Sequence, residues 1–267
     1  MAHPAPLPTF WEFTAPPEWS AIDFISDLHL SEETPRTFEA WATHLRETSA
    51  SAVFLLGDLF EVWVGDDARH GGFEMRCAEV LADAAARRTV AFMAGNRDFL
   101  VGGDLLKQCG VLALPDPTVL LAFGERLMLS HGDALCLDDL EYQQFRIQVR
   151  SPRWQREFLA RPLPERREQA RHMRAQSRQR KQRQSPADWV DIDVATAVRW
   201  MHEANTPTLI HGHTHRPARE PLAPGYAREV LSDWDLDDHG PPRAEVLRLR
   251  RAGLSRLAPQ GAGPAAA

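Results

Sequence analysis

Three histidines stand at alternate positions late in the chain, in the stretch LIHGHTHRP at residues 209–217. Alternate side chains of an extended segment point to the same side, so the rings of His211, His213 and His215 are expected to lie together. Neutral imidazole is the commonest metal ligand in proteins. A histidine pair of this spacing is half of a metal site, because the cation also needs carboxylate or amide ligands from elsewhere.

Four earlier motifs supply such ligands, and each follows a short apolar run. They are D-L-H at 27–29, G-D at 57–58, G-N-R-D at 95–98 and H-G-D at 131–133. The candidate ligands are Asp27, His29, Asp58, Asn96, His131, His213 and His215. Divided between two cations that share one carboxylate, this set predicts a site that activates water for attack on a phosphoryl group. Mixed nitrogen and oxygen donors favour Mn²⁺, Fe²⁺ or Zn²⁺ over Mg²⁺ or Ca²⁺.

The elements that must position these residues are indicated by the apolar runs themselves. Their length and their β-branched and aromatic content predict buried strands, and residues 36–49 and 73–88 between the early runs predict helices. Residues 227–236 and 243–250 are further strand candidates. Alternation of strands and helices predicts a layered α/β fold, whose ligand sites lie beyond the carboxyl ends of the strands. Glycines beside the ligands, at 57, 95, 132 and 212, would allow sharp turns and close backbone approach.

Residues 138–190 break this pattern and predict a helical insertion over the strand ends. Between Arg146 and Arg183 there are 13 basic and three acidic residues, a balance of +10, in a chain whose net charge is −6. Such a block suggests an anionic partner, which could be nucleic acid, a phosphorylated ligand or an anionic membrane. A solvated helical face explains the charge equally well.

The motif series resembles the calcineurin-like metallophosphoesterase superfamily. Arg97 stands where that superfamily usually has a histidine. With this replacement, the stretches ISDLHL, LGDLFEVWVGDD, GNRDFLVGG, LSHGDALCLDD and IHGHTHRP resemble the branch of UDP-2,3-diacylglucosamine pyrophosphatases of the lipid A pathway, over residues 21–237. The fold implied is a four-layer αββα sandwich with a helical insertion cap. Its expected parts are an irregular lead-in (1–20), the core (21–137 and 191–255), a lipid-binding cap (138–190) and a disordered tail (256–267).

The resemblance also implies residue roles. One metal would take Asp27, His29, Asp58 and His215, and the other Asp58, Asn96, His131 and His213, with Mn²⁺ the expected ion. The implied catalytic residues are Asp58, Asn96, Arg97 and His131, with Arg97 clamping the phosphate. The implied substrate contacts are Asn96, Arg97, Asp139, Ser177, Lys181, Gln184 and His213.

The implied activity is hydrolysis of UDP-2,3-diacylglucosamine to UMP and 2,3-diacylglucosamine 1-phosphate by a hydroxide that two metals activate. The expected partners are this acylated nucleotide and an anionic membrane surface, with no nucleic acid and no obligate protein partner. Two alternatives stay open. One is a soluble nucleotide phosphodiesterase or nucleoside-polyphosphate hydrolase of the same superfamily, and the other is a metal-free interaction module.

Composition indicates the compartment. No apolar stretch approaches the roughly 18 residues that span a membrane, and the N-terminus lacks the basic start and apolar core of a secretory signal. We therefore expect a cytoplasmic protein that associates peripherally with the inner membrane. Three widely spaced cysteines predict buried free thiols rather than disulfides or a zinc site.

Further polar residues beside the motifs are expected to support the site or to lie outside it. His211 is expected to be structural. Asp133 is expected to be a partner of a metal-bound histidine rather than a ligand. The histidines that belong to no motif are expected at the surface, and these are His44, His70, His172, His202 and His239.

Overall fold

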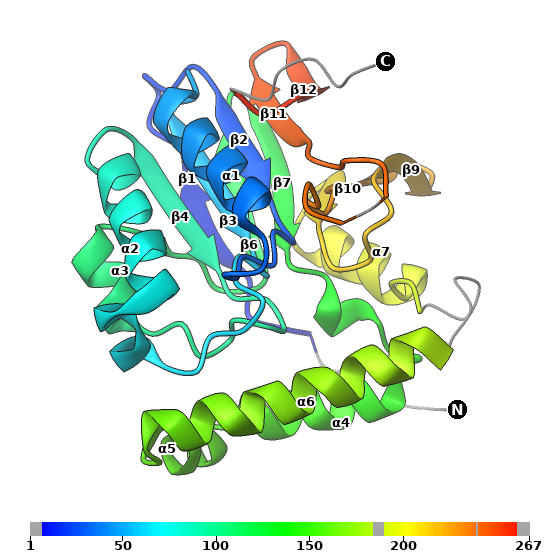
Figure 1. Cartoon of the computed structure of the whole chain (residues 1–267). Helices are drawn as coiled ribbons and strands as arrows, with labels where there is room; N and C mark the ends of the chain where they lie inside the picture. The colour runs from blue at the N-terminus through cyan, green and yellow to red at the C-terminus, as the bar shows by residue number, and fades with distance from the viewer. Residues whose placement is uncertain (1–6, 184–189, 239, 261–267) are drawn as a thin grey trace.

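The computed structural model describes residues 7–183, 190–238 and 240–260, without the side chains of 177, 178 and 180–183. Two six-stranded sheets pack face to face between layers of helices (Figure 1). The first sheet has the order β12 (Gly253–Leu257), β11 (Val246–Arg250), β2 (Ile22–Ile25), β3 (Ala52–Leu56), β4 (Thr89–Met93), β5 (Leu112–Ala113). The second has the order β1 (Trp11–Thr14), β6 (Thr118–Ala122), β7 (Glu125–Ser130), β8 (Thr208–His211), β10 (Tyr226–Val230), β9 (Ala218–Ala223).

Side-chain alternation along the strands creates the layers. In β3, Val53 and Leu55 join the apolar cluster under α1 (Pro35–Glu47), α2 (Gly72–Ala85) and α3 (Gly103–Cys109). Phe54 and Leu56 point the other way, into the cluster between the sheets. A third cluster packs the second sheet against α7 (Val194–Glu203). These clusters give the order helix, sheet, sheet, helix and confirm the predicted four-layer α/β fold.

Parallel pairing brings the polar motifs to one edge. In the first sheet β2, β3 and β4 run parallel, and in the second β7 runs parallel to β8. Each of these five strands ends just before one of the motifs. Their carboxyl ends therefore form a common rim across both sheets.

Three helices between β7 and β8 form the cap, which lies along one side of the sandwich (Figure 1). They are α4 (Leu140–Val149), α5 (Pro152–Leu159) and α6 (Leu163–Arg183). Ser151 caps α5, since its side chain accepts a hydrogen bond from the Trp154 N–H at 3.3 Å. No helix in the described part of the chain is long and apolar enough to cross a bilayer.

Three sequence-based expectations need correction. The lead-in is not irregular throughout, because Trp11–Thr14 forms β1, which pairs with β6. The tail does not begin at 256, because β12 continues to Leu257. His44 is fully buried rather than at the surface, and its Nε2 lies 3.2 Å from the Asp23 carboxylate. The three cysteines are buried free thiols, as predicted.

Candidate active site

The loops after β2 and β8 bring three predicted metal ligands together. Nε2 of His29 and Nε2 of His215 face each other at 3.4 Å. The same nitrogen of His215 lies 3.3 Å from Oδ1 of Asp27. Asp27 is fully buried, and its carboxylate also accepts the backbone N–H of His213 at 3.0 Å.

A second group forms beside the first, around Asn96 after β4. Its side-chain Oδ1 lies 3.0 Å from Nε2 of His131 and 2.9 Å from Nδ1 of His213. The other carboxylate of the site, Asp58 after β3, has Oδ1 3.6 Å from the same His131 nitrogen. All seven predicted ligands thus lie in two adjoining groups at the rim of the sheets.

The donor atoms fit a pair of divalent cations. Two sets of side chains, Asp27 with His29 and His215, and Asp27 with Asp58 and His131, each have ligand atoms within 4.8 Å of one another. Asp27 belongs to both sets, whereas the sequence-based assignment shares Asp58 between the metals. That assignment of Asp58 as the shared ligand stays a prediction.

Electrostatics in the protein alone also favours a cation here. Burial raises the pKa of Asp58, and the nearby charge of Asp27 raises it further. Burial would also raise the pKa of Asp27, but His215 and two other imidazoles hold it below its usual range. Two carboxylates buried this close repel each other, and a divalent cation between them removes that cost.

The backbone is shaped for these ligands. Asp27, His29, Asp58, His213 and His215 have φ between 49° and 65°, a left-handed conformation that few residues other than glycine adopt. Only two other non-glycine residues of the described chain, Phe123 and Asn205, share it. Such conformations persist only where the surrounding structure enforces them, and they concentrate at functional sites.

Two glycines allow the loops to pack against the carboxylates. A Cβ atom on Gly95 would overlap the carboxylate and backbone nitrogen of Asp58. A Cβ atom on Gly212 would overlap the Asp27 carboxylate and the Ser26 hydroxyl. The glycines of G-N-R-D and G-H-T-H are therefore required by close approach rather than by φ.

Two of the imidazoles direct their second ring nitrogen at an oxygen of the protein. Nδ1 of His131 lies 2.9 Å from the Leu56 carbonyl, so it donates there and leaves Nε2 facing Asp58. Nδ1 of His215 lies 3.6 Å from Asp233, whose carboxylate is held by Arg243 at 3.0 Å. Metal-binding histidines are usually fixed in this way. Asp233 was missed by the sequence reasoning, because it follows a strand that carries no ligand motif.

Arg97 extends from the same loop as Asn96 toward the site. Its backbone N–H donates to Asp58 Oδ1 at 2.9 Å, and its Nε lies 3.6 Å from Oδ2 of the same residue. The guanidinium also donates to Glu61 at 2.6 Å. It lines the cavity beside the proposed ligands, which is the place a phosphate clamp needs.

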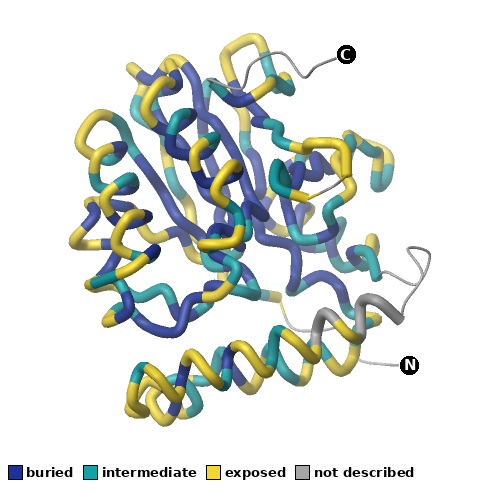
Figure 2. Tube along the Cα trace, viewed as in Figure 1, coloured by how far each residue is buried: buried dark blue, intermediate teal, exposed yellow. Residues whose placement is uncertain are grey.

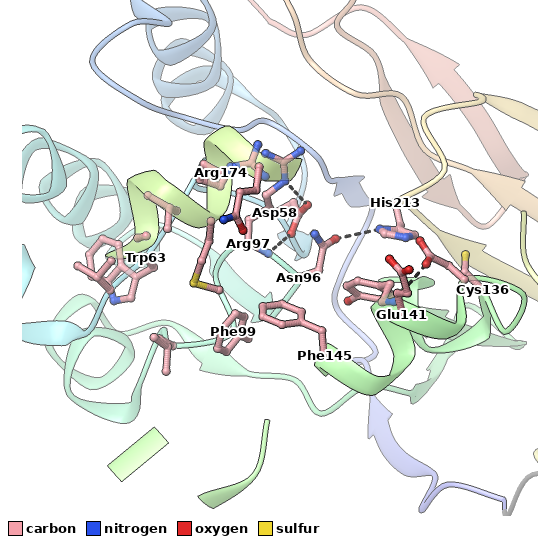
Figure 3. Close-up of a pocket in the computed structure, with 18 of the residues that line it drawn as sticks. Asp58, Trp63, Asn96, Arg97, Phe99, Cys136, Glu141, Phe145, Arg174 and His213 are labelled. Atoms are coloured by element: carbon pink, nitrogen blue, oxygen red, sulfur yellow. Dashed lines mark hydrogen bonds and ion pairs between the residues drawn. The ribbon is translucent and has the colours of Figure 1, made fainter. Parts of the chain in front are cut away.

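A cavity of about 540 Å³ runs from the metal ligands to the cap. Its lining includes the polar residues Asp58, Asn96, Arg97 and His213 together with many apolar side chains. The apolar wall includes Trp63, Phe99, Phe145, Trp154, Phe158 and Met173. Figure 3 shows Asn96 directed at His213, with Phe99 and Phe145 facing the same space.

Comparison with known proteins agrees with this geometry. The family model described as calcineurin-like phosphoesterase matches residues 20–217. The chain belongs to this phosphoesterase family. The predicted enzyme class, a metal-dependent hydrolase, is confirmed by that membership.

Individual relatives of this phosphoesterase cover most of its length. A UDP-2,3-diacylglucosamine hydrolase of Chromobacterium violaceum is 46% identical over 89% of this chain and 98% of the relative. That of Bordetella pertussis is 42% identical, over 89% and 93%. A solved structure of Yfce, a phosphoesterase from E. coli, aligns with a TM-score of 0.44 and 17% identity over 91% of this chain and 95% of the other. The resemblance to the UDP-2,3-diacylglucosamine branch is thus confirmed by the curated relatives.

Asp133 attaches the cap of this phosphoesterase to its core. The carboxylate accepts hydrogen bonds from Arg146 Nε at 2.8 Å and from the Tyr142 hydroxyl, and Arg150 lies at 3.4 Å. Tyr142 and Arg146 belong to α4, and Arg150 directly follows its last residue. Asp133 was expected to be the partner of a metal-bound histidine, but its hydrogen bonds within the described chain go to the cap.

A second attachment lies at the start of α6. Arg166, almost fully buried, donates to Asp67 Oδ1 at 2.9 Å and to the Val64 carbonyl. A third joins Arg174 of α6 to Glu61, at 2.6 Å. Neither the Arg166 pair nor the Arg174 pair could be predicted from local motifs, because each joins segments far apart in the sequence.

The predicted headgroup contacts are placed unevenly. Asp139 lines the cavity, and its side chain also caps α4 by accepting the Tyr142 N–H at 3.1 Å. Ser177 and Lys181 belong to α6, but their side chains are outside the described set. Gln184 lies outside the described residues, as does His239. His211 is buried with Nδ1 2.9 Å from the Gly212 carbonyl and is in neither group of candidate ligands.

Proposed function

We propose that this chain hydrolyses the pyrophosphate bond of UDP-2,3-diacylglucosamine to UMP and 2,3-diacylglucosamine 1-phosphate. The observation that carries the proposal is the cavity, whose lining combines proposed metal ligands and arginines with aromatic side chains. Such a lining suits a ligand that is both phosphorylated and apolar. The names of the curated relatives support the same substrate.

Two divalent cations, with Mn²⁺ as the proposed ion, would be held by the seven ligands assigned above. When bound, they lower the pKa of an attacking water and neutralise charge at the phosphorus. Asn96 and His213 would also contact the substrate phosphate. Asp139, Ser177, Lys181 and Gln184 remain proposed headgroup contacts. Metal analysis of the purified protein, loaded with each candidate ion in turn, tests the metal assignment.

Arg97→Ala should lower turnover by about 30- to 1000-fold, which corresponds to about 2 to 4 kcal/mol for a contact to transition-state charge. Metal binding should persist, because the change removes a positive charge beside the Asp58 carboxylate. Steady-state kinetics and metal content, measured on the same preparation, check this. Loss of metal in the variant would show that Arg97 supports the metal centre rather than the phosphate.

Phe145→Ser should raise KM for the diacylated substrate about tenfold or more, since burying one aromatic side chain against a ligand is worth about 1.5 to 3 kcal/mol. Ile147→Ser is the matched control when the substrate is dispersed in detergent without a membrane, because Ile147 lies on the same helix but is 72% exposed. The assay compares acylated and deacylated UDP-sugar. Equal turnover of both by the unmodified protein would favour the alternative, a soluble nucleotide phosphodiesterase.

The outer surface of the cap suits peripheral contact with an anionic membrane. Leu140 and Ile147 of α4 are 70% and 72% exposed, and Arg153 of α5 and Arg171 of α6 are 85% and 73% exposed. Exposed positions run along the cap in Figure 2. Each basic residue near an anionic surface contributes about 1 kcal/mol, which salt screens.

Vesicles that contain phosphatidylglycerol should therefore bind the protein at low salt and release it as salt rises. Leu140→Ser with Ile147→Ser should weaken this binding while turnover of a small phosphodiester stays unchanged, because neither residue lines the cavity. Vesicle co-sedimentation measures it. Vesicle binding that changes neither with salt nor with the double substitution would contradict a role for this surface.

A further inference from the structure

Glu61 lies where the metal centre, the phosphate-facing arginine and the cap meet. It belongs to the segment after β3, where its backbone N–H donates to the Leu30 carbonyl at 3.0 Å. Its side chain is 18% exposed, and so is that of Arg174 across the boundary with the cap. The carboxylate is thus fixed at its base and shielded from most of the solvent.

The two oxygens of Glu61 face different parts of the molecule. Oε2 accepts Nη1 of Arg97 at 2.6 Å and lies 3.7 Å from Nδ1 of His29. Oε1 accepts Nη2 and Nε of Arg174, at 2.6 and 3.0 Å. One carboxylate therefore contacts the core loops on one side and α6 on the other.

Glu61 also faces the second ring nitrogen of His29. His131 and His215 direct their second ring nitrogen at a carbonyl and a carboxylate, as described above. Nδ1 of His29 is buried and has no hydrogen-bond partner in the described part of the chain, with Glu61 at 3.7 Å and Asp58 at 4.0 Å facing it. Glu61 is thus placed to be the third such partner, since a small approach would make the contact a hydrogen bond.

We propose that Glu61 is a positioning residue that couples docking of the cap to metal binding. It orients the His29 ring and the Arg97 guanidinium, and Arg174 of α6 holds it in that position. The inference rests on His29 being a metal ligand, as proposed above. Because coupling is reciprocal, metal binding should in turn tighten α6 against the core.

If only charge mattered, the variants would change metal affinity in a different pattern, and this difference makes the inference testable. Loss of the Glu61 charge would weaken metal binding under either explanation. Loss of the Arg174 charge would strengthen it if only charge mattered, because a cation near the site repels the metal. Coupling through Glu61 predicts the opposite sign for Arg174.

The experiment measures Mn²⁺ affinity of the full chain by competition with a chelating indicator. Glu61→Gln should weaken binding about ten- to a hundredfold, the usual effect of losing a partner of a metal-bound histidine. Arg174→Gln should weaken it severalfold, and adding it to Glu61→Gln should weaken binding no further. Asp67→Asn is the control, because it disturbs the other attachment of α6, at Arg166, away from the metal centre.

Amide hydrogen exchange gives a second readout that does not depend on activity. Mn²⁺ should slow exchange in α6 of the unmodified protein and of Asp67→Asn, but have little effect in Glu61→Gln. Tighter Mn²⁺ binding by Arg174→Gln, or unchanged binding by Glu61→Gln, would overturn the inference. Failure of the unmodified protein to bind two metals would instead overturn the proposed function.

Discussion

Replacing Asp58 with alanine should lower turnover by at least about a thousandfold, because two-metal activation of water is the main catalytic device proposed here. Asp58 is the carboxylate assigned to both metals, so the substitution removes a ligand from each. The folded protein should survive, since burial and Asp27 already raise the pKa of Asp58 and make its charge costly without metal.

Steady-state kinetics, metal content and thermal unfolding of the metal-free protein check this expectation together. Asp58→Asn is the companion variant, because asparagine tolerates the left-handed backbone at this position, with φ 54°. Either variant retaining a tenth of the activity with two metals bound would contradict the assignment. If the variants do not fold in the absence of metal, the role of Asp58 is structural.

Replacing Arg248 with methionine should destabilise the fold by about 3 to 5 kcal/mol, the usual cost of removing one partner of a buried ion pair. Arg248 on β11 donates to both oxygens of Asp23 on β2, at 2.6 and 2.8 Å, and both residues are almost completely buried. Thr48 donates to the same carboxylate at 2.6 Å, and His44 lies beside it. Urea unfolding measures the loss, and Asp23→Leu added to Arg248→Met should recover much of it. A loss under about 1 kcal/mol would contradict the argument.

The ionisation of Asp23 also determines how the stability of the fold should depend on pH. Burial would raise the pKa of Asp23, but hydrogen bonds from Arg248, His44 and Thr48 lower it from 3.8 to about 2. A carboxyl group whose pKa is lowered by folding stabilises the fold at pH values above its pKa in the unfolded chain. That contribution is lost as pH falls from about 4 to about 2. This contribution to the free energy of unfolding is about 2 kcal/mol. It should be absent from the double variant that carries Arg248→Met and Asp23→Leu.

The sequence-based prediction succeeded where the signal was local. Each proposed ligand, such as Asp58 or Asn96, directly follows an apolar strand, so pattern and chemistry could be read from a few residues. The parallel strands then had to bring those ends together, and they do. Residue type, strand end and sheet topology agreed, so the grouping of these side chains at one rim could be predicted from the chain alone, and their role as metal ligands stays a prediction.

The residues that were missed depend on tertiary pairing. Glu61 becomes informative only when α6 brings Arg174 to it from 113 positions away. His44 carries no motif, and its buried partner Asp23 is itself held by Arg248 from a second strand. β1 was hidden because its short stretch between prolines pairs only at the edge of a sheet. Such features are fixed by distant contacts, which composition and periodicity do not report.

The left-handed backbone of five proposed ligands has a consequence for how the protein acquires its metals. These conformations lie where strands of two packed sheets end, and three apolar clusters hold those sheets and their helices together, so the fold that carries the ligand loops has its own source of stability. In small zinc domains the opposite holds, and the chain unfolds when the metal leaves. In this protein we expect the metals to exchange without unfolding of the chain. The protein could fold first, take the ion that its surroundings offer, and recover from chelation without refolding.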